Sequence, residues 1–301
     1  MPNSRDIPFS KYHGLGNDFV LIDALARPDL AELPWGVWAS SLCARHTGIG
    51  ADGLLIVSHA PDADAAMRVV NADGSDGGMC GNGVRCVARH LVERHSRTPD
   101  SIRVRVGERV LPISCANIKE DFSARVRMGR PSRSAEGDAA AKIAPETMPA
   151  DLLGACDTAA PGWLEASGAQ AEFVRVHMPN PHAVVFCRSV EAVPVVSVGP
   201  VIESHGLFPD RTNVQFVEVQ GRSRTRIRTW ERGAGATRAC GTGACAAVAA
   251  GVATGRLDRA VDVELPSGRL RIEWEDDPGE MAMTGPAARV FDGVVQPPTR
   301  G

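Results

Sequence analysis

Hydrophobic and polar residues follow the same order in both halves of the chain. In the first half, short apolar runs at residues 19–22, 53–57 and 67–71 predict strands, and a helix with one apolar face follows them. In the second half, strand-like runs precede a stretch of small apolar residues at 244–250. A helix made of such residues would be buried almost all round. The pattern therefore predicts one long helix in each half, preceded in the sequence by several strands.

Alternating apolar and polar residues follow each predicted helix, at 102–128 and again from 261 to the C-terminus. This order predicts an α+β fold of two pseudo-symmetric domains, each a long central helix wrapped by a curved, mostly antiparallel sheet. We place the first domain at residues 1–132, with residues 287–301 returning to it, and the second at 133–286. Residues 131–162 show no clear period, and we interpret them as the connection between the domains plus a variable surface segment.

Composition limits the classes of function. A chain of 301 residues is long enough for two cores, and a net charge of −3 with a pI near 6.3 gives no basic footprint for nucleic acid. The N-terminal residues lack an apolar signal core, and the run at 244–253 is too short to span a bilayer. The eight cysteines show no disulfide spacing. We expect a soluble, cytoplasmic protein with no membrane or nucleic-acid partner.

A cysteine followed by Gly-x-Gly stands directly ahead of each predicted helix: CGNG begins at Cys80, and CGTG begins at Cys240. The unpaired N–H groups and the dipole at a helix N-terminus favour a thiolate over a thiol. Two glycine-rich turns with buried cysteines are the alternative interpretation. Because the arrangement is repeated, it favours two reactive thiols that face each other across a cleft between the halves.

These two motifs, with GLGNDFVLID, RHTGIGADG, MPNPHAV and FPDRTNV, resemble those of diaminopimelate epimerases. They occur in the family's order over nearly the whole chain, residues 131–162 excepted. The resemblance implies inversion of one α-carbon of LL-2,6-diaminopimelate to give the meso isomer, a precursor of lysine and peptidoglycan. It also implies an active site in the cleft between the domains, a small-molecule substrate, no cofactor and no metal.

The resemblance makes Cys80 and Cys240 the catalytic pair, in which one thiolate removes the α-proton and the opposite thiol returns one. It assigns the distal ammonium of the substrate to Glu231, which is also placed in the catalytic set, and the distal carboxylate to Arg232. It likens His182 to a histidine that assists catalysis. The other implied substrate contacts are Asn17, Asn71, Gly81, Asn82, Asn180, Asn213, Gly241 and Thr242.

The residue types suit these roles. Backbone N–H groups at two helix N-termini would bind the carboxylate of the reacting carbon, and the fork of Arg232 matches a carboxylate bidentately. Without the resemblance, each asparagine would be interpreted as a turn residue, His182 as a structural histidine, and Glu231 with Arg232 as a solvated pair. Two positions depart from the family pattern, with Ala236 where Glu is usual and Gly53 where Gln is common.

Two other functions remain open on the sequence. One is a proline racemase or hydroxyproline epimerase, which also uses two cysteines but usually has His where Asn82 stands and needs no distal arginine. The other is a thiol protein that binds metal or acts in redox chemistry, although the remaining cysteines lack metal-ligand spacing. On the last predicted strand, Phe291 stands where related enzymes carry an aromatic residue at a dimer interface, so we expect a homodimer.

Overall fold

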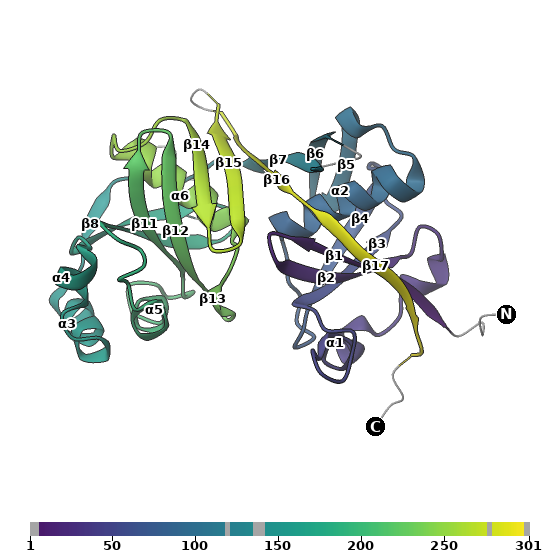
Figure 1. Cartoon of the computed structure of the whole chain (residues 1–301), viewed down its shortest axis with the longest axis horizontal. Coiled ribbons are helices and arrows are strands. Elements are labelled where there is room, and N and C mark those ends of the chain that lie inside the picture. The colour runs from purple at the N-terminus through teal and green to yellow at the C-terminus, as the bar shows by residue number, and fades with distance from the viewer. Residues whose placement is uncertain (1–5, 118–120, 135–141, 276–278, 298–301) are drawn as a thin grey trace. The chain divides into compact units, whose positions relative to one another are not determined.

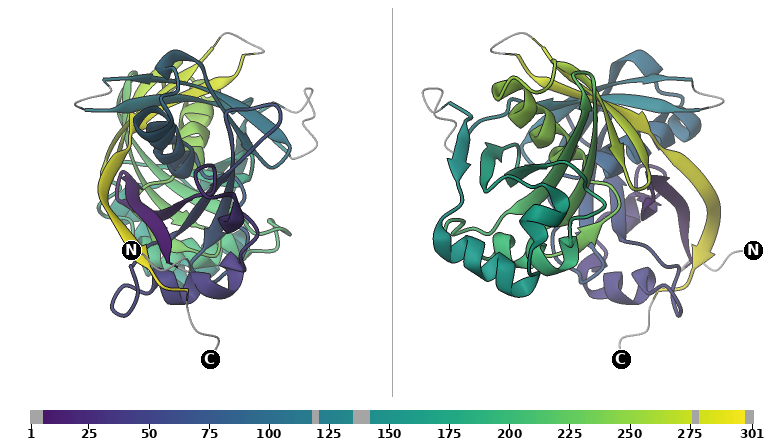
Figure 2. Two further views of the ribbon diagram at one scale, coloured as in Figure 1. Left: turned by 90° about the vertical axis from the view of Figure 1, so that its right-hand side faces the viewer. Right: turned by 60° about the vertical axis from the view of Figure 1, so that its left-hand side comes forward.

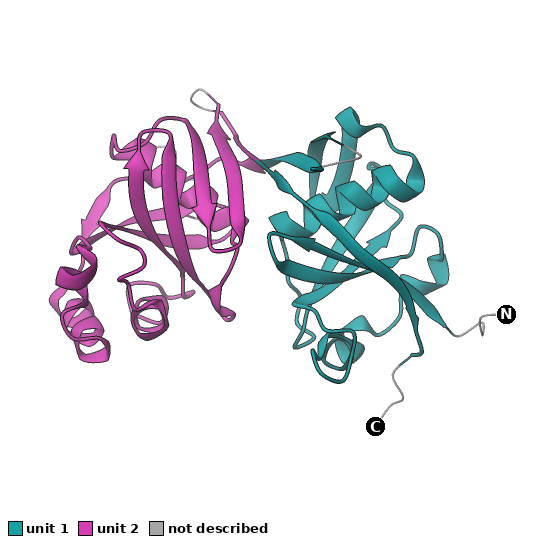
Figure 3. Cartoon of the chain, viewed as in Figure 1, with its two compact units in different colours: residues 1–127, 284–301 teal, residues 128–283 magenta. Residues whose placement is uncertain are grey.

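The computed structural model describes residues 6–117, 121–134, 142–275 and 279–297 (Figure 1). The chain divides into two compact units, Met1–Arg127 with Thr284–Gly301 and Met128–Met283 (Figure 3). Among the described residues, no helix combines the length and the apolar character that crossing a bilayer requires.

Unit 1 contains eight strands and two α-helices within its described residues. Its strands pair in the order β17-β1-β2-β3-β4-β5-β6-β7, and all neighbours are antiparallel except β2 with β3 and β4 with β5. The elements are β1 (Ile7–Gly14), β2 (Asn17–Asp23), α1 (Trp35–Cys43), β3 (Gly53–Ser58), β4 (Ala65–Asn71), α2 (Gly81–His95), β5 (Ile102–Val106), β6 (Arg109–Ala116), β7 (Ser123–Gly129) and β17 (Ala288–Val295).

Unit 2 repeats this pairing. Its strands run β8-β9-β10-β11-β12-β14-β15, parallel only between β10 and β11 and between β12 and β14, while β13 adds to β12 as a hairpin. The elements are β8 (Pro145–Thr147), α3 (Ala150–Ala159), α4 (Trp163–Ser167), β9 (Glu172–His177), β10 (Pro181–Cys187), α5 (Val195–Glu203), β11 (Asn213–Gly221), β12 (Arg224–Glu231), β13 (Gly235–Thr237), α6 (Gly241–Ala253), β14 (Ala260–Leu265) and β15 (Gly268–Trp274). Strand β16 (Met281–Pro286) begins in unit 2 and ends in unit 1.

The long helix occupies the same place in both units. α2 connects β4 to its parallel neighbour β5, and α6 lies in the connection from β12 to its parallel neighbour β14, as a parallel pair requires. Each helix contacts several strands of its own unit and runs along the inside of their curve (Figure 2). Every residue of α6 from 241 to 251 is buried. The predicted fold class, a long helix wrapped twice by a mostly antiparallel sheet, is confirmed.

The sequence-based interpretation was incomplete for residues 131–162, because this segment contains β8 and α3. Leu152 and Cys156 of α3 belong to the core of unit 2, although Leu153, Gly154 and Ala155 between them obscure the helical period. The structure does not describe residues 135–141 within this segment. Helix α5 was not predicted at all, even though Val195, Val198 and Ile202 are buried at helical spacing.

Candidate active site

Cys80 is the N-cap residue of α2 in unit 1. Its backbone is extended (φ −127°, ψ 104°), and its Sγ accepts the N–H of Gly83 at 3.4 Å. The side chain is half-buried. A sulfur that accepts a backbone N–H at a helix N-terminus is held where negative charge is favoured. The thiol of Cys80 therefore occupies a position that stabilises a thiolate.

Cys240 caps α6 in unit 2 with nearly the same geometry. Its backbone angles are −124° and 109°, and its Sγ accepts the N–H of Gly243 at 3.3 Å. A Cβ atom on Gly243 would lie 3.1 Å from this sulfur and 2.8 Å from Nε2 of Gln215. Glycine is required at this position because a side chain would displace the thiol. The repeated Cys-Gly-x-Gly motif thus corresponds to a repeated local geometry.

The two thiols differ in their surroundings. Cys240 is 4% exposed, whereas Cys80 is half-buried. Burial raises the pKa of the Cys240 thiol well above its usual value, and the negative charge of the Glu231 carboxylate raises it further, against smaller opposing effects of Thr242 and Gly243. In this structure Cys240 is therefore a neutral thiol, able to give a proton.

His182 lies in β10, beside Asn213 in the parallel β11, and it is fully buried. Its Nδ1 lies 2.9 Å from the side-chain amide of Gln215, and its Nε2 lies 2.8 Å from that of Asn180. Burial lowers the pKa of His182 to about 3, despite the opposing hydrogen bond to Gln215. A neutral imidazole has one N–H, so it donates to only one of these two amide oxygens.

The turn that follows β12 carries the residues assigned to the distal end of a substrate. Asn213 accepts the backbone N–H of Arg232 at 3.0 Å and donates to the carbonyl of Pro181 at 2.8 Å. The exposed side chain of Arg232 donates to the carbonyl of Asp210 at 2.7 Å. Glu231 accepts the hydroxyl of Thr237. Asn213 therefore joins this turn to the start of β10.

Glu203 was missed by the sequence analysis, and it fixes the same turn. This buried carboxylate at the end of α5 accepts the indole N–H of Trp230 at 2.7 Å and the N–H of Gly233 at 3.0 Å, and it pairs with Arg211 at 2.7 Å. In the sequence, Glu203 is marked only by its position as an acidic residue at the end of an apolar segment. Such a residue needs partners if it is to be buried, and these come from segments far along the chain.

Asn17 and Asn82 come together beside Cys80 in unit 1. The amide of Asn82 donates to Oδ1 of Asn17 at 3.1 Å, and this oxygen lies 3.9 Å from Sγ of Cys80. Two further residues that the sequence analysis missed hold this pair. Asp52 accepts the amide of Asn17 at 2.9 Å, and the fully buried Arg85 donates to Asn82 at 2.8 Å.

The remaining predicted residues lie as follows. Gly81, Asn82, Gly241 and Thr242 are all buried in the first turns of α2 and α6. Asn71 ends β4, and its amide donates to Ser75 within the next turn at 2.9 Å. At Gly53, a Cβ atom would lie 2.7 Å from the carbonyl of Val70, so β3 and β4 leave no room there for a side chain.

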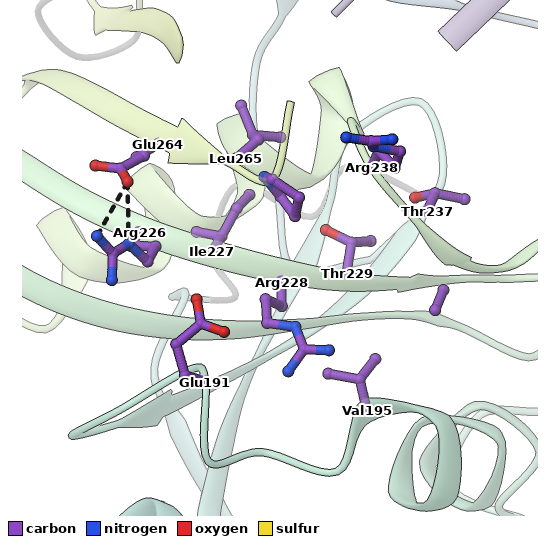
Figure 4. A pocket seen from close by; sticks show the side chains of 12 residues that line it. Glu191, Val195, Arg226, Ile227, Arg228, Thr229, Thr237, Arg238, Glu264 and Leu265 are labelled. Atoms are coloured by element: carbon purple, nitrogen blue, oxygen red, sulfur yellow. Dashed lines mark hydrogen bonds and ion pairs between the residues drawn. The ribbon is translucent and has the colours of Figure 1, made fainter. Parts of the chain in front are cut away.

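Unit 2 also has a hollow of about 540 Å³ along β12 (Figure 4). It is lined by side chains such as Arg228 and Thr229 and by the ion pair of Arg226 with Glu264. Neither Cys240 nor Glu231 is among the lining residues that the structure describes. Among its lining residues that the structure describes, Thr237 connects the hollow to the candidate site by donating to Glu231.

The other six cysteines are buried, and none of the eight, all of which the structure describes, forms a disulfide. In each of five of them, burial is the largest cause of a raised pKa, to about 11 in Cys43 and Cys156 and about 12 in Cys86, Cys115 and Cys187. Inert, buried thiols of this kind are packing residues.

Comparison with known proteins identifies the family. The family model described as diaminopimelate epimerase matches residues 9–134 and 174–290. The chain is 41% identical over 291 residues to diaminopimelate epimerase of Synechococcus elongatus, covering 96% of this chain and 98% of that protein. It is 44% identical to that of Pelotomaculum thermopropionicum, covering 95% and 97%. The chain belongs to the diaminopimelate epimerase family.

This match confirms the resemblance seen in the sequence. Solved structures of other proteins show that the same fold occurs outside the family. A phenazine biosynthesis protein of the PhzF family from Bacillus anthracis superposes with a TM-score of 0.69 at 14% identity, covering 96% of this chain and 99% of that one. A probable proline racemase from Agrobacterium radiobacter gives 0.64 at 16%, covering 96% and 92%. These likenesses show that the diaminopimelate epimerase fold is shared, without bearing on the substrate.

Proposed function

We propose that this enzyme interconverts LL-2,6-diaminopimelate and the meso isomer without a cofactor, in the cytoplasm, for the synthesis of lysine and peptidoglycan precursors. Membership of the diaminopimelate epimerase family supports this reaction. The observation that carries it is the pair of cysteine N-caps, Cys80 and Cys240, with matching geometry on two helices. Inversion at carbon needs a base on one face and an acid on the other, and two thiols supply both.

The surroundings of the thiols assign the resting roles. Cys240 holds its proton because it is buried beside the Glu231 carboxylate, and we assign the role of thiolate to the less buried Cys80, whose Sγ accepts the N–H of Gly83. Cys80 takes the α-proton of the bound substrate, the electron pair of the C–H bond moves toward the adjacent carboxylate, and Cys240 returns its proton to the opposite face. The roles are exchanged in the reverse direction.

The charge that develops on the substrate must be stabilised while the proton moves. The N–H groups of Gly81, Asn82, Gly241 and Thr242 lie in the first turns of α2 and α6, at the positive ends of the helix dipoles. In the proposed complex they donate to the carboxylate of the reacting carbon from two helix N-termini. Donors fixed in advance act where negative charge increases, which lowers the barrier without requiring tight binding of the ground state.

Polar side chains bind the distal end of the substrate. Arg232, supported by Asn71 and by Asn180 and Asn213, binds the distal carboxylate, and Glu231 binds the distal ammonium. Asn17 supplies a further contact beside Cys80. The neutral His182 positions Asn180 through the bond at 2.8 Å. This set separates the proposed reaction from that of a proline-type enzyme, whose substrate has no distal amino-acid group.

The test is a substrate panel in thiol-reducing buffer that compares the wild type with Arg232→Lys. The wild type is expected to epimerise LL-2,6-diaminopimelate and to leave L-proline and trans-4-hydroxy-L-proline unchanged. Lysine keeps the charge but loses the bidentate fork, so kcat/KM for diaminopimelate should fall roughly 100-fold with the melting temperature retained. Turnover of proline by the wild type, or normal turnover of diaminopimelate by the variant, would favour the proline-type alternative.

We also propose that the chain forms a homodimer through β17. Phe291 and Val294 are 45% and 59% exposed on this strand, and a hollow of about 310 Å³ lined by Phe9, Leu42 and Val294 lies beside them. Exposed apolar side chains grouped in this way favour association with another copy.

We expect light scattering to give the mass of a dimer for the wild type, and Phe291→Asp to shift the mass toward that of a monomer, because a buried unpaired charge is costly at an interface. Val37→Asp, at a side chain 70% exposed in α1, is the matched control and should remain dimeric. A monomeric wild type would contradict the proposal.

A further inference from the structure

A second group of ionisable side chains converges in unit 1, at the opposite end of α2 from Cys80. Asp23 ends β2, and His90 and His95 lie in the last two turns of α2. Oδ2 of Asp23 lies 3.0 Å from Nε2 of His90 and 2.8 Å from Nε2 of His95. One atom from each of the three residues lies within 4.8 Å of the other two.

We propose that Asp23, His90 and His95 form a binding site for one divalent transition-metal ion, with zinc as the preferred ion. Two imidazole nitrogens and one carboxylate oxygen are donors that suit zinc, whereas calcium and magnesium prefer oxygen alone. In a tetrahedral complex with bonds of about 2.0–2.1 Å, neighbouring ligand atoms are roughly 3.3 Å apart. The two distances from Asp23, 3.0 and 2.8 Å, need to lengthen by a few tenths of an ångström, and the two imidazole nitrogens, within 4.8 Å of each other, need to take the same spacing.

The atoms behind the three ligands are already arranged to support them. Oδ1 of Asp23 accepts the N–H groups of Leu25 and Ala26, both at 3.0 Å, which orients Oδ2 toward the histidines. Nδ1 of His90 lies 3.3 Å from Oη of Tyr12, which in turn lies 3.3 Å from Oε2 of Glu93. A hydrogen-bond partner on the far ring nitrogen fixes the tautomer of a metal-ligating histidine.

The proton count around Tyr12 favours an ion over a neutral hydrogen-bonded network. If neutral His90 donates from Nε2 to Asp23, its Nδ1 can only accept, so the single hydroxyl proton of Tyr12 must serve either His90 or Glu93. If a metal ion occupies Nε2, Nδ1 carries the proton and donates to Tyr12, which then donates to Glu93. Both contacts of Tyr12 are then satisfied. A doubly protonated His90 would satisfy them too, and the experiment below separates these cases.

The site is accessible and lies far from the proposed chemistry. The side chains of His95 and Asp23 are 22% and 21% exposed, so an ion can enter and water can complete its coordination. α2 has 15 residues, so at about 1.5 Å per residue its two ends are roughly 22 Å apart. A metal ion there would join the end of the helix to β2 and stabilise unit 1 without touching substrate. The proposal is thus independent of the epimerase reaction.

The test uses the full chain, treated with a chelator and then titrated with zinc while the melting temperature is followed. We expect binding of one ion, and a rise of roughly 5–10 °C at about a hundredfold excess over Kd. His95→Gln keeps an N–H for Asp23 but removes an imidazole ligand, so it should fold and lose the shift. His59→Gln, at an exposed histidine of the same unit, should retain it.

Titration with cobalt identifies the ligands, because thiolate ligands produce an intense charge-transfer band that imidazole and carboxylate ligands lack. We expect the visible bands of a bound cobalt ion without the thiolate band, and their loss in His95→Gln. Three results would overturn the proposal: an unchanged zinc shift in His95→Gln, a thiolate band in the wild type that survives in this variant, or no zinc shift in the wild type. The last result would identify the cluster as a protonated hydrogen-bond network.

Discussion

Cys80→Ala and Cys240→Ala are each expected to lower epimerisation of diaminopimelate by roughly 10³-fold or more. A single general acid or base typically contributes about 10²–10⁴ to the rate, and inversion fails when either face lacks its group. The two losses should not add in the double variant, because removal of one thiol already disables the reaction. The measurement is the rate of formation of the meso isomer from the LL isomer, followed by chiral chromatography in reducing buffer.

Both substitutions also remove a helix N-cap, so stability needs a separate control. Loss of a capping side chain costs about 1 kcal/mol, which leaves a chain of this size folded. Cys80→Ser and Cys240→Ser keep an oxygen that can accept the N–H of Gly83 or Gly243, yet a hydroxyl is far less acidic than a thiol. The serine variants should therefore regain melting temperature without regaining epimerisation. Activity near that of the wild type in either alanine variant would exclude its cysteine as an acid or base.

A β-halo analogue of the substrate separates the two faces. Elimination of a halide needs only one base to remove the α-proton, so each alanine variant should still eliminate halide from the isomer whose α-proton faces the remaining thiol. This readout tests whether the site still binds substrate in register. If both variants lost elimination on both isomers, the loss of epimerisation would reflect a disrupted site rather than a missing proton carrier.

The sequence predicted those parts of the site that local patterns encode. The N-cap positions of Cys80 and Cys240 were predicted because a helix N-cap depends on only a few neighbouring residues, here the Gly-x-Gly that follows each cysteine. The order of strands before and after each long helix was also predicted, because it too depends on a local pattern of apolar and polar residues. The parallel pairs, β2 with β3 and β10 with β11, were not predicted, because they depend on crossover connections rather than on local alternation.

The residues that hold the site in place could not be predicted in this way. Gln215 meets His182 across 33 positions of sequence, and Arg85 reaches the carbonyl of Pro286 across 201. Glu203 is buried only because α5 brings it to Trp230 and its turn. Each of these contacts depends on which strands and helices become neighbours, and polar side chains that satisfy buried partners leave no period in the sequence.

Deuterium from solvent is expected in the product from the first turnover in heavy water. The resting Cys240 thiol exchanges its proton with solvent before substrate binds, so it carries deuterium to the inverted carbon. Cys80 receives the substrate's own proton, and reversal of that step before exchange returns hydrogen. Early samples should therefore contain meso product deuterated at the inverted α-carbon and recovered LL substrate that is still largely protonated. Proton NMR of both isomers at low conversion measures the two fractions directly.

The same measurement separates a two-thiol mechanism from a single base that serves both faces. One base would carry the abstracted proton to the other face, and some product would keep the substrate's α-hydrogen. Cys240 is 4% exposed, so its proton exchanges with solvent only when the site is open. The proton that it gives to the product therefore comes from solvent that entered before substrate was bound. Substantial retention of the α-hydrogen in the product would contradict the roles given to Cys80 and Cys240, whatever the rates of the alanine variants.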